Sequence, residues 1–194
     1  MTDSPDWRRR KWEATHQRIY DAALRLFQEH GFDRVSVGQI AAGAEVSVPT
    51  FYAHYPSKEH ILMRLPTPEE IAALAAALPK GLPLWERLKQ AAPIFFATWE
   101  WTPEFRGAQL TRWRIIAGEP ALRTRAAEFE RTTAEYLVAA LRSESGDPVG
   151  PTDAAVVNAY MAAYTAGLLA WAVTDGQRPV EDFVAEALDA LRGH

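Results

Sequence analysis

The chain has 194 residues, a net charge of −4, no cysteine and 48% hydrophobic residues. This composition excludes a disordered chain, a disulfide framework and a thiolate zinc site. No apolar run approaches the roughly 20 residues of a membrane span, and no apolar segment follows the basic N-terminus. We therefore expect a cytoplasmic protein with no membrane partner.

Positive charge is concentrated in one run near the N-terminus, at Arg8, Arg9, Arg10 and Lys11. Residues 1–62 as a whole hold eight basic and eight acidic side chains, so bulk charge does not indicate a nucleic-acid binder. The run could follow a DNA backbone or enter a minor groove, or it could be a disordered, solubilising tail.

Residues 17–62 have the pattern of three short helices and the start of a fourth. The first helix carries apolar residues at helical spacing and ends at Gly31. A left-handed conformation at Gly31 would let Phe27 meet Phe32. Ser36 and Gln39 have the spacing of a capping box, which opens the second helix.

The third helix follows after only a few residues. Ser47 can cap it, Pro49 is tolerated in its first turn, and Pro56 stops it. Ser57 can cap the fourth, which would begin at Lys58. This succession predicts helix-turn-helix geometry.

The remaining residues indicate longer helices and no strands. Proline, glycine and capping residues separate the predicted segments. These helices cover residues 67–78, 85–101, 102–118, 122–141, 153–174 and 180–192, with a loop at 145–153.

Residues 35–62, VSVGQIAAGAEVSVPTFYAHYPSKEHIL, closely resemble the DNA-binding motif of the TetR family of transcriptional regulators. The resemblance begins at residue 16. The matching residues are Ala22, Ala23, Leu26, Phe27, Gly31, Phe32, Ser36, Val37, Ile40, Ala41, Val46, Ser47, Thr50, Tyr52, His54, Tyr55, Lys58, Glu59 and Leu62.

The resemblance implies an all-α protein with three parts. A basic N-terminal arm covers residues 1–15, and a three-helix helix-turn-helix DNA-binding domain covers 16–62. A larger helical domain for effector binding and dimerisation covers 63–194. The implied partners are double-stranded DNA, a second copy of the chain and a small-molecule effector, with no cofactor, metal or catalytic residue.

One residue departs from the family pattern. Glu45 stands in the turn where the family usually has glycine, while Gly43 lies two residues earlier. Either Glu45 takes the left-handed conformation, at a cost of about 1 kcal/mol relative to glycine, or the second helix ends early at Gly43.

The exposed early positions of the third helix would face the major groove. Val48 and Pro49 offer no side-chain hydrogen bonds, which favours apolar contact with thymine methyl groups. The other predicted DNA contacts are phosphate-binding or capping residues. They are Ser36, Val37, Ser47, Thr50, Tyr52, His54, Lys58, Arg8, Arg9 and Arg10. Tyr52 and His54 are expected to point outward, and Lys58 is expected to bind a phosphate. The serines could equally be caps alone.

The last two helices carry small and bulky apolar residues suited to a four-helix dimer interface, or to packing within one chain. The predicted interface residues are Ala159, Ala163, Gly167, Trp171, Phe183, Leu188 and Leu191.

An aromatic segment with arginines predicts a pocket for a lipophilic, acidic effector, although these aromatics could also be ordinary core. The predicted lining is Phe95, Phe96, Trp99, Arg112, Trp113, Ile116, Tyr136 and Tyr164. Residues 112–125, RWRIIAGEPALRTR, are also similar to an acyl-CoA-responsive, mycofactocin-type subgroup of the family.

Two other classes of protein are alternatives to a DNA-binding regulator. An enzyme is disfavoured because the chain has no nucleophile elbow, phosphate loop or dinucleotide motif. Glu13 and His16 have the Glu-x-x-His spacing of di-iron bundles, but no second copy exists. The remaining alternative is a helical module that binds a small molecule or a protein and does not bind DNA sequence-specifically.

Overall fold

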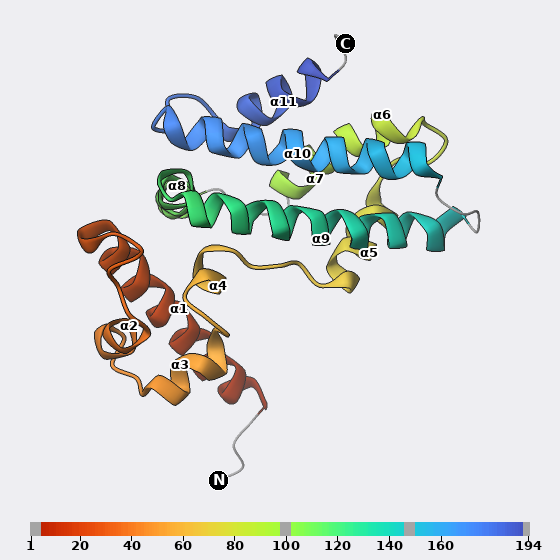
Figure 1. Ribbon diagram of the computed structural model, residues 1–194. Coiled ribbons are helices and arrows are strands. Elements are labelled where there is room, and N and C mark those ends of the chain that lie inside the picture. The colour runs from red at the N-terminus through yellow and green to blue at the C-terminus, as the bar shows by residue number, and fades with distance from the viewer. Residues whose placement is uncertain (1–4, 98–101, 146–149, 192–194) are drawn as a thin grey trace. The chain divides into compact units, whose positions relative to one another are not determined.

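The computed structural model describes residues 5–97, 102–145 and 150–191, and these form helices without strands. The chain divides into two compact units, Met1–Arg64 and Leu65–His194, so the boundary falls two residues after the predicted one. Figure 1 shows the helices of each unit. The N-terminal unit contains α1 (Pro5–His30), α2 (Val37–Gly43), α3 (Val48–His54) and α4 (Glu59–Leu62).

Helix α1 begins much earlier than predicted. The segment expected to be an arm or a disordered tail is helical from Pro5 onward. Its turns lack an apolar stripe but carry ion pairs, since Arg9 lies 3.2 Å from Asp6 and 3.9 Å from Glu13. These charge spacings favour the additional helix, but a search for hydrophobic periodicity does not detect them.

The end of α1 confirms the predicted cap. Gly31 has φ +82°, and its amide donates to the carbonyl of Phe27 at 2.9 Å. The rings of Phe27 and Phe32 then lie 5.0 Å apart. The cap turns the chain toward α2.

A single apolar core holds the N-terminal unit together. Ile19, Ala23, Ile40, Phe51 and Leu62 are all 0% exposed. Helix α2 packs on both α1 and α3. Burying one side of three short helices leaves their other sides to solvent, which is what a DNA-reading surface requires.

The C-terminal unit contains longer helices around α10. Its helices are α5 (Pro68–Ala77), α6 (Leu84–Lys89), α7 (Ala91–Ala97), α8 (Pro103–Gly118), α9 (Pro120–Ser145), α10 (Pro151–Val173) and α11 (Val180–Ala190). Helix α10 packs on α11, α9, α8 and α6, and α5 packs on α9. The two longest helices of this unit, α9 and α10, run beside each other (Figure 1).

The helix predicted over residues 85–101 is interrupted. Helix α6 ends at Lys89 and α7 begins at Ala91. Pro93 explains the break, because it has no amide hydrogen and its ring clashes with the carbonyl four residues earlier, at Lys89. Residues 98–101 of that prediction lie outside the described part of the chain.

Helix α10 has the length and mean hydropathy of a membrane-spanning helix, contrary to the expectation that the chain has no such segment. Its most apolar window has mean hydropathy 1.4, and 39% of that window is buried inside the chain. Val157, Tyr160 and Trp171 are among the α10 residues in the core. Packing within the unit therefore accounts for part of the apolar character of α10.

Candidate nucleic-acid interface

Helix α2 begins at the predicted capping box. The amide of Gln39 donates to Ser36 Oγ at 3.3 Å, and the amide of Ser36 donates to Gln39 Oε1 at 2.8 Å. These bonds satisfy two amides that would otherwise lack a partner at the helix start. Ser36 is exposed as well, so its hydroxyl lies at the surface of the unit.

In the turn between α2 and α3, both alternatives for Glu45 are confirmed: the second helix ends early, and Glu45 is left-handed. Helix α2 ends at Gly43, and Glu45 has φ +55°. The amide of Glu45 donates to Ala42 O at 3.1 Å and that of Val46 donates to Ala41 O at 2.9 Å. This pair of bonds is a Schellman motif, with Glu45 in the left-handed position that glycine prefers.

Ser47 caps helix α3, which has one face buried in the unit and an outward face exposed to solvent. The amide of Thr50 donates to Ser47 Oγ at 3.1 Å, and the two hydroxyl oxygens lie 2.7 Å apart. Phe51 is 0% exposed, whereas Val48 and Tyr52 are 41% and 53% exposed. Pro49 is also exposed, so the outward face is the one predicted to meet DNA.

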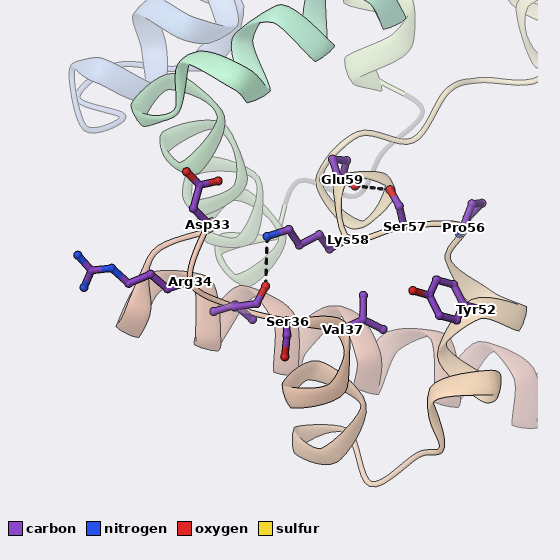
Figure 2. Close-up of a pocket in the computed structure, with 10 residues that line it drawn as sticks. Asp33, Arg34, Ser36, Val37, Tyr52, Pro56, Ser57, Lys58 and Glu59 are labelled. Carbon is purple, nitrogen blue, oxygen red and sulfur yellow. Dashed lines mark hydrogen bonds between the residues drawn. The ribbon is translucent and has the colours of Figure 1, made fainter.

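An open pocket of about 420 Å³ lies beside this face. Figure 2 shows its walls: the loop between α1 and α2, Tyr52 on α3, and the chain that leads into α4. The lining residues are Asp33, Arg34, Val35, Ser36, Val37, Tyr52, Pro56, Ser57, Lys58 and Glu59. The structure thus brings together four of the residues predicted to contact DNA: Ser36, Val37, Tyr52 and Lys58.

Lys58 is held inward by the unit itself. Its Nζ donates to the carbonyl oxygens of Phe32 at 2.8 Å and Val35 at 3.1 Å, and lies 4.2 Å from the centre of the Phe32 ring. Figure 2 shows its side chain directed toward the α1–α2 loop. Two of its three donors are therefore used within the protein. Its expected role as a phosphate clamp stays a prediction, and the structure adds a role in fixing this loop.

The start of α4 also differs from the prediction. The helix begins at Glu59, and the hydroxyl of Ser57 does not cap it but bonds the Glu59 carboxylate and His60 Nδ1. Burial alone would raise the pKa of Glu59. Hydrogen bonds from Ser57 and from the backbone of Glu59, together with the charges of Lys58 and His60, outweigh it and lower this pKa.

His54 does not point freely outward as expected. Its ring stacks on Trp12 at 4.8 Å between centroids, and Trp12 stacks on His16 at 4.7 Å. The sequence pattern gave Trp12 and His16 no structural role, because the predicted first helix began too late, at residue 17 instead of Pro5. Their spacing of four residues would place them on one helix face once α1 is extended.

The basic run lies on the first turns of α1. Arg8, Arg9 and Arg10 are all exposed, and Arg9 pairs with Asp6. Their side chains therefore project from a helix rather than from an extended arm, so any DNA contact that they make is set by the orientation of α1.

The predicted effector residues are partly brought together in the C-terminal unit. The rings of Phe96 and Tyr164 lie 6.1 Å apart, and the guanidinium of Arg112 lies 5.6 Å from the Trp113 ring. Burial raises the pKa of Tyr164, and the charge of Arg112 acts in the opposite direction. Tyr136 packs on the same core and Ile116 is fully buried. The side chain of Phe95, and all of Trp99, lie outside the described residues.

Most residues predicted for the dimer interface are already buried within one chain, which favours the alternative that they pack within it. Their exposed fractions are Ala163 7%, Trp171 1%, Phe183 9% and Leu188 4%. Gly167 is also buried, and a Cβ there would lie 2.7 Å from Val184 Cα of α11. Gly167 thus brings α10 close to α11, and the other four lie in the core of the same unit. Ala159 is half-buried, and Leu191 is 45% exposed.

Comparison with known proteins identifies the N-terminal unit. Residues 19–65 match the family model described as bacterial regulatory proteins, tetR family. An HTH-type transcriptional regulator of Mycobacterium tuberculosis is 39% identical over 52 residues, which cover 27% of this chain and 26% of that one. The HTH-type transcriptional repressor KstR of Rhodococcus jostii is 40% identical over 47 residues, which cover 24% and 22% of the two chains. The matched part thus spans about a quarter of these relatives.

The fold of the whole chain is similar to that of a solved repressor. The crystal structure of Thermus thermophilus FadR, a TetR-family transcriptional repressor in complex with lauroyl-CoA, has a TM-score of 0.51 and 23% identity. The similarity covers 91% of this chain and 93% of that one. The proteins that match the N-terminal unit are named as regulators rather than enzymes. Residues 19–65 of this chain thus form a helix-turn-helix unit of the kind found in the TetR family of bacterial regulatory proteins.

Proposed function

We propose that the protein is a cytoplasmic transcriptional repressor that binds a near-palindromic operator as a homodimer. A small lipophilic, acidic effector would release it. The observation that carries this proposal is the outward face of α3. Val48 and Tyr52 are 41% and 53% exposed beside the fully buried Phe51. A short helix anchored on one side, with apolar and aromatic groups left in solvent on the other, is suited to a DNA groove.

The residues of this face divide between base and phosphate contacts. Val48 and Pro49 would contact thymine methyl groups, because neither side chain can form a hydrogen bond. Thr50 and Tyr52 carry hydroxyl groups that could bond phosphate oxygens. Arg8 and Arg10 on α1 would add contacts that depend on salt and not on sequence.

A second copy of the chain would bind the remaining open face of α10. Ala162, Ala166 and Ala170 are exposed on this helix at intervals of four residues, and Val173 is 76% exposed. Small residues let two helices approach closely, and Leu191 at 45% exposure adds apolar area after α11. A two-fold dimer would present two copies of α3 to successive half-sites.

The effector would bind in the C-terminal unit near Phe96, Tyr164, Arg112 and Trp113. Aromatic side chains with a nearby guanidinium suit a lipophilic molecule that carries an acidic group. The complex of the FadR neighbour with lauroyl-CoA supports a long-chain acyl-CoA as the first candidate. Release of DNA would require the acyl-CoA to favour a state with lower DNA affinity, by about 1–3 kcal/mol.

The proposal is tested with a duplex that the purified protein selects from a random library. We expect two chains to bind per duplex, and lauroyl-CoA to weaken binding by about 5-fold to 150-fold. Free coenzyme A and lauric acid are the matched controls for the two halves of the ligand. Selection of a duplex without release by lauroyl-CoA would contradict the effector class alone. Failure to select any duplex would favour a helical module without sequence-specific DNA binding.

A further inference from the structure

Four aromatic rings join the first part of α1 to the end of α3. We call Trp12, His16, His54 and Tyr55 the aromatic brace. Trp12 lies 4.7 Å from His16 and 4.8 Å from His54, and His16 lies 4.2 Å from Tyr55, all in stacked geometry. The two imidazole rings are 5.7 Å apart. The brace therefore fixes the C-terminal end of the helix whose outward face is proposed to read DNA.

The polar atoms of the brace favour neutral histidines. Tyr55 Oη donates to the His16 carbonyl at 3.3 Å, which ties the two helices together. Within the described residues, Nδ1 of His16 and Nδ1 of His54 are each buried without a hydrogen-bond partner. Protonation would place a hydrogen on each of these atoms with no acceptor to receive it.

The surrounding charges act in the same direction. Burial lowers the pKa of His16, and the charges of His54 and Arg64 lower it further. Burial also lowers the pKa of His54. At Tyr55, burial raises the pKa, and Tyr20 and Asp21 raise it further, so its hydroxyl keeps its proton. Two imidazolium rings stacked on one indole would repel each other.

We propose that Trp12 is a positioning residue for α3, and that the aromatic brace holds α3 for DNA binding only while His16 and His54 are neutral. This inference rests on the proposed DNA-binding function. It gives the N-terminal turns of α1 a role that does not depend on phosphate contact. It also makes sequence-specific binding weaker in mild acid.

The alternative role of His54 predicts the opposite sign. If its imidazole contacted a phosphate, protonation would add an attractive charge to the interface. Acid would then strengthen DNA binding, and the dependence of affinity on salt would become steeper. The direction of the pH effect therefore separates positioning from direct contact.

The first test measures affinity for the selected duplex at pH 7.5 and pH 5.5, at constant ionic strength. We expect the wild type to bind about tenfold more weakly at the lower pH, with an unchanged salt slope. Trp12→Ala should bind about fivefold more weakly than the wild type at pH 7.5 and lose little more in acid. Trp12→Phe, which keeps a ring to stack, should restore most of the affinity.

Trp7→Ala is the matched control. Trp7 and Trp12 are 46% and 49% exposed on the same helix, but among the described residues no histidine stacks on Trp7, whose ring lies 5.0 Å from the ammonium of Lys11. We expect Trp7→Ala to match the wild type at both pH values. Equal effects of the two alanine variants, or stronger binding in acid, would overturn the proposal.

A second measurement does not depend on DNA. Proton NMR titration should place the pKa values of His16 and His54 below the ordinary 6.5, and Trp12→Ala should move both toward 6.5 while Trp7→Ala leaves them unchanged. Ordinary pKa values in the wild type would overturn the brace itself. If the wild type selected no duplex, the proposed function would fail while this titration still decided whether the brace forms.

Discussion

The two units of the chain differ in the length of their helices and in the polar contacts that begin them. In the N-terminal unit, the seven-residue helices α2 and α3 begin at serine caps, and the side chain of Lys58 ties the start of α4 to the loop before α2. In the C-terminal unit, α9 and α10 have 26 and 23 residues and bury apolar side chains over much of their length. Helices of seven residues are too short to be stable alone, so α2 and α3 depend on packing against the apolar core of the unit. Their serine caps, which sequence spacing can reveal, set where they begin.

The largest expected effect tests close packing in the C-terminal unit. Gly167→Ala should lower the free energy of unfolding by about 3 kcal/mol, because its new methyl group would meet the backbone of Val184. Gly107→Ala on α8 is the matched control, since a Cβ there meets nothing within 4 Å. It should stabilise by up to about 1 kcal/mol. Thermal or denaturant unfolding measures both, and equal effects would contradict the close contact of α10 with α11.

The second-largest effect tests the hydrogen bonds that Lys58 donates within the N-terminal unit. Lys58→Met should lower the free energy of unfolding by about 2 kcal/mol, since two carbonyl groups lose a charged donor. If Lys58 acts only within the protein, Lys58→Met should leave the slope of log operator affinity against log salt concentration unchanged. A slope reduced by about 1, with unchanged stability, would show that Lys58 binds a phosphate instead.

A smaller effect of opposite sign is expected at the turn. Glu45→Gly should raise the free energy of unfolding by about 1 kcal/mol, because Glu45 holds φ +55°. Glu45→Ala keeps the steric penalty of a Cβ and should give no comparable gain. Chemical denaturation distinguishes the two variants, and an equal gain from both would point to the charge of Glu45 rather than to its backbone.

The smallest expected effect is the pH dependence of stability. The folded-state pKa values of His16 and His54 lie below 6.5, so both groups are neutral in folded and unfolded chains above that pH. As the pH falls below 6.5, the unfolded chain takes up protons first and stability declines. Replacing both histidines with glutamine should flatten the curve of melting temperature against pH between 7 and 5.

The sequence was most informative where a local contact determines the structure. Ser36, Ser47 and Gly31 marked helix ends that the structure confirms, because caps act over three or four residues. The exposure of Val48 and Tyr52 also followed from the pattern around Phe51. The start of α1 was missed because its first turns are exposed and have no apolar period.

Tertiary contacts accounted for the remaining differences. Gly167 and Trp171 have the small and bulky side chains of a helix interface, but composition does not tell whether the partner helix belongs to the same chain. The structure places Gly167 against Val184 of α11 and buries Trp171 in the core of the same chain. The same limit applies to Lys58, whose acceptors Phe32 and Val35 lie 26 and 23 residues away in the sequence.

The most direct test of the account is duplex selection by the purified wild-type protein at two salt concentrations. The account predicts a near-palindrome whose half-sites lie about 10 base pairs apart, or a multiple of that spacing, recovered at both concentrations. Recovery of no shared sequence, with retention lost at the higher salt, would show non-specific charge contacts only. That result would contradict the reading of DNA by the outward face of α3.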